Sequence, residues 1–226
     1  MLFDIIGSGG KIDFITLIVQ ALSSLAVIFL TLPVHEFAHA YTAVKLGDPT
    51  PRYTGRLTLN PLNHIDYLGA ASILLFGFGW AKPVQVNTRY FKNPKRDMAI
   101  TAVAGPISNL VVCFISVFIA TLVTEIFPFS DVAFYIGVFL INIGYINVYL
   151  AVFNLIPIPP LDGSRLLTAL LPYKYYNMLM RYERYIFLGL LALLWVGVLD
   201  IPLDFLSGAV MTFLEFIAGL PFGFIR

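Results

Sequence analysis

The chain has 226 residues, of which 59% are hydrophobic and only 12% are charged, and its formal net charge is +1. Soluble domains carry about 25% charged residues, so this composition indicates an integral membrane protein rather than a soluble one. The small net charge gives no support for nucleic-acid binding, and the single cysteine, Cys113, excludes a disulfide framework.

Apolar runs of about 20 residues predict the membrane spans. Five such runs occur in chain order: Phe14 to Val44, Met98 to Val123, Val132 to Ile156, Tyr185 to Leu199, and Leu203 to Ile225. A further apolar stretch, Leu68 to Trp80, is short and contains three glycines, so we interpret it as re-entrant or as part of a hairpin. We therefore expect an all-α polytopic membrane protein with five to six transmembrane helices and a small β-hairpin or re-entrant element after the first core helix.

The positive charges predict the orientation of these spans. If the N-terminus lies outside, all 14 lysines and arginines except Lys11 fall on the cytoplasmic side, and the C-terminus lies there too. The spans fill the chain, so we expect a single transmembrane domain over residues 1–226. Its core motifs lie between residues 20 and 170, and its C-terminal helices lie between 184 and 226. The predicted location is the cell membrane, with multiple passes.

The most distinctive motif is His35-Glu36-Phe37-Ala38-His39, at the end of the first apolar run. Residues i and i+4 of a helix share a face, so His35 and His39 can offer two imidazole nitrogens to one zinc ion. Glu36 lies between them and can take a proton from a zinc-bound water. Ionisable residues inside a membrane are costly and mark functional sites. We therefore predict a metal hydrolase that works within the bilayer.

A catalytic zinc usually has three protein ligands, so one more residue is needed. The candidates for this third ligand are His64, Asp66, Asp162 and Glu215. Asp162 stands out because it follows a span that ends in three prolines, and because it is predicted at the same membrane face as the two histidines. Its alternative role is to cap a short helix from Ser164 to Leu171. We expect the ligand role, since the two histidines otherwise lack a partner.

Taken together, the motifs resemble those of the site-2 protease family of intramembrane zinc metalloproteases. The H-E-x-x-H motif is paired with N-x-x-P-x-P-P-L-D-G over residues 154–163, and residues 104–109 are similar to that family's G-P-x-x-N element. Residues 60–66 and 79–87 resemble elements of its compact prokaryotic members, without PDZ or CBS domains. The resemblance implies one Zn²⁺ per chain, held by His35, His39 and Asp162, with Glu36 as the catalytic base.

Three further polar residues have two interpretations each. The family pattern places Asn154 near the metal, and we expect its amide to donate to the oxyanion of the reaction; the alternative is a hydrogen bond between helices. Asn109 lies one turn after Gly105, and helix packing is its favoured role. His64 lies in an Asn-Pro loop and is favoured as a turn residue. For Asn109 and His64 the alternative is a contact with the substrate or with the metal ligands.

A substrate helix has to unwind before its peptide bonds can be reached. The stretch Arg52 to Asn60 alternates weakly between apolar and polar residues, which predicts a β-strand. Val84 to Asn87 is a suitable partner for it. We expect an edge of such a sheet to hold the unwound substrate by strand addition.

The sequence thus predicts an endopeptidase that cleaves transmembrane segments of other proteins near the cytoplasmic face. The resemblance implies regulated intramembrane proteolysis of transmembrane proteins by an enzyme that lies in membrane lipid. The sequence decides neither the oligomeric state nor whether a regulatory membrane partner exists. Two alternatives belong to other classes. A divalent-metal transporter also needs intramembrane histidines and carboxylates, but the chain has no internal repeat. An inactive scaffold that binds membrane helices needs none of the four predicted site residues, so their presence argues against this alternative.

Overall fold

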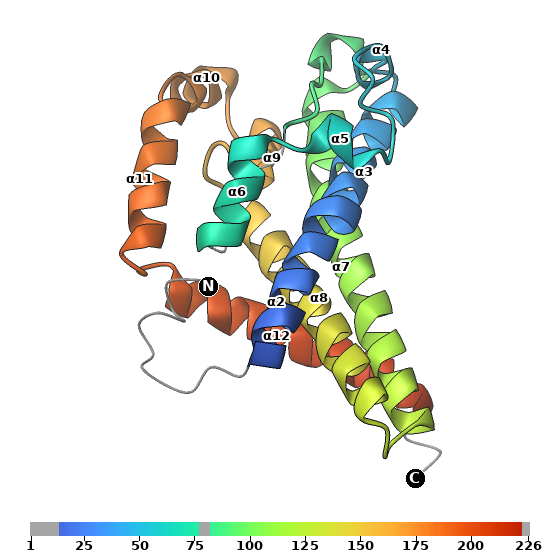
Figure 1. Ribbon diagram of the computed structural model, residues 1–226. Coiled ribbons are helices and arrows are strands. Elements are labelled where there is room, and N and C mark those ends of the chain that lie inside the picture. Colours follow the sequence, from blue (N-terminus) through green and yellow to red (C-terminus); the bar gives the residue numbers. More distant parts are fainter. Residues whose placement is uncertain (1–13, 77–81, 223–226) are drawn as a thin grey trace.

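The computed structural model describes residues 14–76 and 82–222, which are mostly helical (Figure 1). The helices are α2 (Phe14–Ala26), η1 (Val27–Thr31), α3 (Leu32–Lys45), α4 (Thr50–Tyr53), α5 (Pro61–His64), α6 (Tyr67–Phe76), η2 (Thr88–Tyr90), α7 (Pro94–Ile126), α8 (Asp131–Asn154), α9 (Asp162–Leu170), α10 (Tyr173–Arg181), α11 (Glu183–Trp195), α12 (Asp200–Gly219) and η3 (Leu220–Phe222).

Among the described residues, four helical segments are long and apolar enough to cross a membrane. They are Leu17–Lys45, Pro94–Ile126, Asp131–Asn154 and Asp200–Phe222. The chain is therefore a multi-pass membrane protein, as predicted, but the prediction of five to six full spans is wrong for this part of the chain. The expected span from Tyr185 to Leu199 is α11, whose 13 residues reach only about 20 Å at 1.5 Å per residue.

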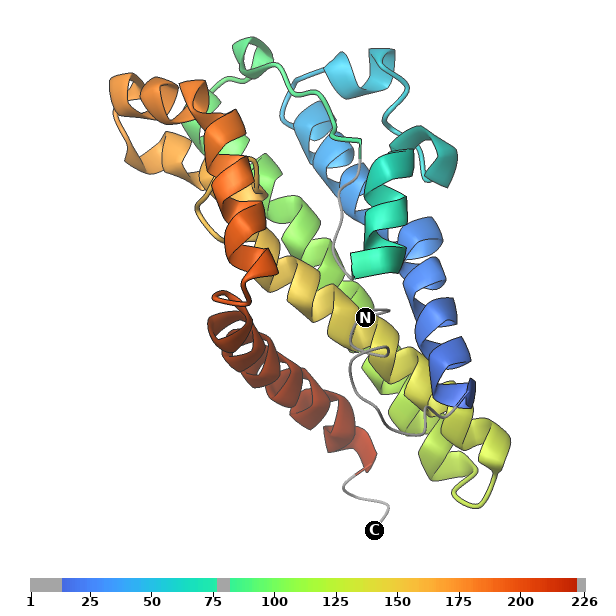
Figure 2. The same cartoon turned by 60° about the vertical axis from the view of Figure 1, so that its left-hand side comes forward.

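The two C-terminal helices run in the same direction. α11 begins beside α10 at one end of the molecule, and α12 continues toward the opposite end, where α7 and α8 are joined (Figures 1 and 2). Asp200 and Pro202 start α12 instead of reversing the chain, because an acid and a proline are both favoured in the first turn of a helix. The end of α12 thus lies opposite α10, whereas the charge pattern predicted a C-terminus on the α10 side.

The charge asymmetry itself is visible in the fold. Every lysine and arginine in the described residues lies between the end of α3 and the start of α7, or between α9 and the start of α11. These segments gather toward one end of the molecule, and the α7–α8 turn lies at the other end (Figure 1). That turn is flanked by Glu125 and Asp131, so the two ends differ in the sign of their charge.

Helix α7 is the centre of the fold, and it packs against α3, α8, α9 and α12. Near its far end, Cys113 and Val117 are buried with Val148 of α8 and Met211 of α12. Many large apolar side chains on the long helices stay exposed, which is expected for helices that face lipid. Cys113 is a small buried residue in this cluster and forms no disulfide.

The first long helix is irregular just before the histidine motif. The N–H of Leu32 donates to the carbonyl of Val27, five residues back, so η1 is a π-type turn. Pro33 follows in the first turn of α3; it has no N–H to donate, and its ring crowds the carbonyl four residues before it. The wider turn gives the proline room, and it changes the rotational phase of the residues that follow.

The predicted strand from Arg52 to Asn60 is wrong. Residues 50–53 form the short helix α4, and the described residues contain no β-sheet. The N–H groups of Arg56 and Leu57 both donate to the carbonyl of Pro51, which closes a compact turn. Gly55 has φ +66°, a value that favours glycine and reverses the chain. Turn chemistry thus outweighs the weak alternation of side chains.

The described part of the apolar stretch from Leu68 to Trp80 lies in the helix α6, which has 10 residues. The chain returns to where α6 began, because the N–H of Lys82 donates to the carbonyl of His64 at 2.8 Å. The part of the prediction that falls on residues 77–81 lies outside the described residues.

Candidate metal centre

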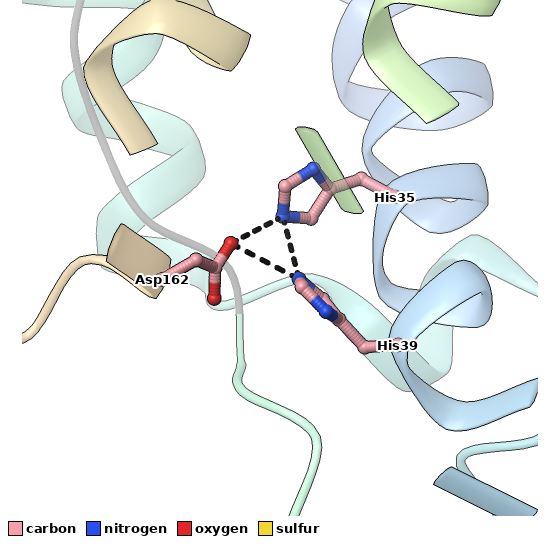
Figure 3. A group of neighbouring side chains, drawn as sticks. All are labelled: His35, His39 and Asp162. Atoms are coloured by element: carbon pink, nitrogen blue, oxygen red, sulfur yellow. Dashed lines mark hydrogen bonds and ion pairs between the residues drawn. The ribbon is translucent and has the colours of Figure 1, made fainter. Parts of the chain in front are cut away.

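Three side chains from two distant parts of the sequence converge at one point. His35 and His39 project from α3, and Asp162 begins α9 (Figure 3). The Nε2 atoms of the two histidines are 3.1 Å apart, and Asp162 Oδ2 lies 3.0 Å from His39 Nε2 and 3.2 Å from His35 Nε2. Within the described residues, this is the group of histidine and acidic side chains that can hold a metal ion.

The end of α8 brings Asp162 to the histidines. α8 ends at Asn154, and the next seven residues contain three prolines, which cannot donate backbone hydrogen bonds. α9 then starts at Asp162, with Leu161 as its N-cap and no side-chain capping bond. A Cβ on Gly163 would lie 2.3 Å from the carbonyl oxygen of Leu155, so only glycine permits this close approach to the end of α8. The capping alternative for Asp162 is therefore not supported.

Helix α7 forms the wall behind the two imidazoles. The carbonyl of Thr101 accepts a hydrogen bond from Nδ1 of His39 at 2.8 Å. One turn further on, a Cβ on Gly105 would lie 2.3 Å from Nε2 of His39 and 2.6 Å from Cε1 of His35. Pro106 follows inside the helix and removes one of its backbone bonds. The absence of a side chain at Gly105 leaves open the space beside the ligand atoms.

The hydrogen bond between His39 and the Thr101 carbonyl orients the imidazole for metal binding. A carbonyl oxygen can only accept, so His39 Nδ1 donates to Thr101, and in the neutral imidazole Nε2 then carries a lone pair. That lone pair faces a second imidazole nitrogen and a carboxylate oxygen. With both imidazoles neutral at Nε2 and the carboxylate ionised, three electron-rich atoms would meet, and a bound cation would hold them together.

The spacing of the ligand atoms fits zinc. Ligand atoms at about 2.0–2.1 Å from a tetrahedral zinc are about 3.3 Å from one another. The three atoms here are separated by 3.0, 3.1 and 3.2 Å. Two imidazoles with one carboxylate are also a donor set that zinc accepts, and three protein ligands leave a fourth position open for chemistry.

Glu36 lies on the same helix and is held by a backbone group. Its Oε2 accepts from the N–H of Val84 at 3.2 Å, and its side chain is buried. Val84 belongs to an extended stretch, residues 82–87, that crosses beside α3 (Figure 2). The carboxylate is thus held by a backbone N–H, and it lines the same cavity as the three metal-binding candidates.

A cavity of about 340 Å³ opens onto these residues. Its polar lining includes Glu36, Asn109, Asn154 and Arg165, together with the three metal-binding candidates. The rest of its wall is mainly apolar. Much of that apolar wall comes from one side of α11: Phe187, Leu190, Leu191 and Leu194. The cavity therefore has a mainly apolar wall with a small number of polar groups.

The structure brings together most of the predicted site residues. Asn154 lines the cavity, and its Nδ2 donates to the carbonyl of Leu150 at 3.0 Å. Asn109 also lines the cavity and is 2% exposed, and both its packing role and its substrate-contact role stay predictions. His64 does not line the cavity; its ring Nε2 bonds the carbonyl of Thr58 at 2.7 Å, as expected for a turn residue.

The other candidates for the third ligand lie elsewhere. Asp66 accepts from the N–H groups of Leu68 and Gly69 and so caps the start of α6. Glu215 is exposed on α12. Two groups that complete the site were not predicted, namely the Thr101 carbonyl and the Val84 N–H. Both are backbone atoms, which residue types do not reveal.

A group of side chains that can hold a metal ion, placed among membrane-crossing helices, is typical of a polytopic membrane metalloprotein. Residues 130–197 match the family described as Peptidase family M50. The chain is 42% identical over 169 residues to "Putative zinc metalloprotease YwhC" of Bacillus subtilis, an alignment that covers 74% of this chain and 77% of the relative. No solved structure matches the chain. The chain belongs to peptidase family M50, the site-2 protease family, and is a zinc metalloprotease.

Other relatives carry similar names. The chain is 34% identical over 140 residues to "Putative zinc metalloprotease Rip2" of Mycolicibacterium smegmatis, which covers 59% of this chain and 51% of the relative. It is 36% identical over 102 residues to "Putative zinc metalloprotease MJ0611" of Methanocaldococcus jannaschii. This alignment covers 44% of this chain and 49% of the relative. The chain thus spans about half the length of these two relatives. The predicted family, enzyme class and metal are confirmed, whereas the transporter and scaffold alternatives find no support.

Proposed function

We propose that this protein hydrolyses peptide bonds in or near transmembrane segments of other membrane proteins. The observation that carries the proposal is the convergence of His35, His39 and Asp162 beside Glu36, on a cavity enclosed by membrane-crossing helices. The basic end of the molecule, toward which α9 lies, is the cytoplasmic end under the positive-inside rule. Cleavage would therefore take place near the cytoplasmic face, with the N-terminus outside.

In this proposal, His35, His39 and Asp162 hold the zinc ion. Zinc, when bound, supplies a Lewis acid that polarises the scissile carbonyl and lowers the pKa of a water to about 7. Glu36 is the general base. The Val84 N–H bonds its Oε2, which leaves Oε1 to take a proton from the attacking water and to deliver it to the leaving nitrogen. The mainly apolar wall of the cavity lowers the local dielectric constant, so these charges act with less screening than in bulk water.

Asn154 is the proposed donor to the oxyanion. Its amide has two N–H bonds, and the one that bonds Leu150 holds the side chain in place while the other is available to the cavity. Asn109 lines the same cavity and is a second polar contact for the substrate. The extended stretch around Val84 supplies a cavity wall along which an unwound peptide can lie.

The proposal is tested with purified protein in detergent and a reporter that contains a transmembrane segment. We expect about one zinc per chain, cleavage of the reporter, loss of cleavage after chelation, and recovery after zinc is restored. Glu36→Gln should retain zinc and lose cleavage by about 10²–10⁴-fold, because it removes the base but no ligand. Zinc-dependent cleavage of soluble peptides alone, or full activity of Glu36→Gln, would contradict the proposal.

Asn154→Ala is expected to lower kcat by about 10²–10³-fold with the zinc content unchanged, since one oxyanion donor is lost. Asn147→Ala is the matched control. Asn147 lies on the same helix and bonds the carbonyl of Ile143 at 2.8 Å, as Asn154 bonds that of Leu150, but it does not line the cavity. Equal losses in the two variants, measured by reporter kinetics, would assign Asn154 to helix packing.

A further inference from the structure

Asp48 is a fully buried acid in the loop that follows the metal-binding helix. It is 0% exposed, and its own N–H donates to the carbonyl of Ala43 at 2.9 Å. Gly47, with φ +111°, makes the turn between them, so α3 ends in a glycine cap of the Schellman type. Asp48 is therefore fixed rigidly to the end of the helix that carries His35, Glu36 and His39.

The Asp48 carboxylate joins this loop to a distant part of the chain. Its Oδ1 accepts from the N–H and the hydroxyl of Thr50, at 2.9 and 2.5 Å. Its Oδ2 accepts from the backbone N–H of Asn87, 39 residues away, at 2.7 Å. Hydrogen bonds to an ionised acceptor are about twice as strong as neutral ones. The bond to Asn87 is not needed to close the α3–α4 loop, because Thr50 already does so.

Asn87 belongs to residues 82–91, which we call the 82–91 segment. Its first residue, Lys82, donates to the carbonyl of His64, and its last, Phe91, is buried against Ala43 and Met98. Between these ends, Val84 donates to Glu36, and the stretch from Lys82 to Asn87 has no regular secondary structure. Among contacts between described residues, the bond from Asn87 to Asp48 is the one hydrogen bond that ties the segment to another element between Val84 and η2.

The position of this segment decides which groups face the active site. Val84 is buried and Val86 half-buried, and both line the cavity, whereas Gln85 between them is exposed. Side chains of an extended chain alternate between two faces, so a slip of one residue would exchange Val84 for Gln85 and move the N–H that Glu36 needs. A bond only three residues from Val84 prevents such a slip.

We propose that Asp48 is a positioning residue for the catalytic glutamate. It anchors the 82–91 segment to the end of α3, so that the Val84 N–H and the cavity wall keep their register relative to Glu36. The inference rests on the proposed function, because it takes Glu36 as the general base. Asp48 itself touches neither the metal ligands nor the cavity.

Two pairs of variants test this proposal. The Asp48 carboxylate accepts from Thr50 with one oxygen and from Asn87 with the other, and in Asp48→Asn one of these oxygens is replaced by an NH₂ group that cannot accept. Thr50→Val removes the hydroxyl bond to the same carboxylate but leaves the bond to Asn87. Asn87→Pro removes the backbone donor from the segment side, whereas Asn87→Ala keeps that donor and removes only the side-chain cap of Arg89. We expect Asp48→Asn and Asn87→Pro to lower kcat by about 10–100-fold, with zinc content retained and KM changed less. The two control variants should stay within about two-fold of the wild type.

Hydrogen–deuterium exchange supplies a readout that does not depend on activity. Backbone amides of the 82–91 segment should exchange faster in Asp48→Asn than in Thr50→Val, while the amides of α7 stay protected. Unchanged exchange in that segment, or equal losses of kcat in Asp48→Asn and Thr50→Val, would overturn the proposal. If the wild type cleaves and Glu36→Gln does not, while Asp48→Asn cleaves normally, only this inference fails. A wild type without activity would refute the proposed function, and the exchange result would still decide the role of Asp48 as an anchor.

Discussion

Gly105→Ala is expected to give a protein that keeps its helices but binds no zinc and cleaves no substrate. The new Cβ would lie 2.3 Å from Nε2 of His39 and 2.6 Å from Cε1 of His35, closer than real Cβ contacts come. Neither ring can easily move away, because His39 is tied to the Thr101 carbonyl and both rings are buried. The methyl group would therefore displace the atoms that bind the metal.

The measurement is the zinc content of the purified variant, together with reporter cleavage and a thermal unfolding curve. Gly144→Ala is a matched control on the facing helix, since its Cβ would meet Val117 Cγ2 at 3.2 Å, Cys113 Sγ at 3.4 Å and the carbonyl oxygen of Cys113 at 3.7 Å, all much farther away than the imidazole atoms beside Gly105. Gly208→Ala meets nothing within 4 Å and should gain helix stability. A Gly105→Ala protein with one zinc per chain would show that the imidazoles occupy other positions.

Much of the candidate site follows from the sequence, because its residues carry strong chemical signals. Two histidines four residues apart share a helix face, and an acid after a proline cluster ends a helix where it can meet them. The sequence also identifies Gly105 as a position of close helix approach. It does not show that the groups that approach Gly105 are the imidazoles of His35 and His39 rather than a neighbouring backbone, because that depends on how α3 and α7 are rotated about their axes.

The errors in the predicted fold also arise where the structure depends on more than residue type. Hydropathy measures composition over a window, so the apolar run at Tyr185 to Leu199 counts as a span although its helix stops at Trp195. A period of two predicts a strand only when turn residues do not interrupt it, and here Gly55 interrupts the stretch from Arg52 to Asn60 while Pro51 directly precedes it. Backbone contacts such as that between Val84 and Glu36 carry no residue-type signal at all.

The two roles weighed for Asp162 turn out to share one position. α9 begins at Asp162 itself, so the carboxylate lies in the first turn, at the positive end of the helix dipole, where an acid is favoured. The same carboxylate points away from the helix, toward His35 and His39 (Figure 3). A helix start can thus present an acid to a metal without using it as a cap, and the residue that follows the acid becomes decisive.

That residue gives the second large effect. Gly163→Ala is expected to lower zinc affinity by about 10–100-fold or more and to reduce cleavage in parallel. Its Cβ would lie 2.3 Å from the carbonyl oxygen of Leu155 and 2.4 Å from that of Ile156. These are backbone atoms at the end of α8, so α9 has to move as a whole, and Asp162 moves with it.

Ser164→Ala separates this effect from a general loss of stability. Ser164 is buried, and its hydroxyl donates to the carbonyl of Leu161 at 2.7 Å, so its removal costs a local hydrogen bond of about 1 kcal/mol but leaves the α8–α9 contact intact. We expect Ser164→Ala to unfold at a lower temperature yet titrate zinc like the wild type, and Gly163→Ala to require more zinc for half-saturation. Identical zinc titrations for the two variants would mean that the position of α9 does not control the metal centre. The carboxylate would then reach the histidines through its own side-chain freedom rather than through the glycine contact.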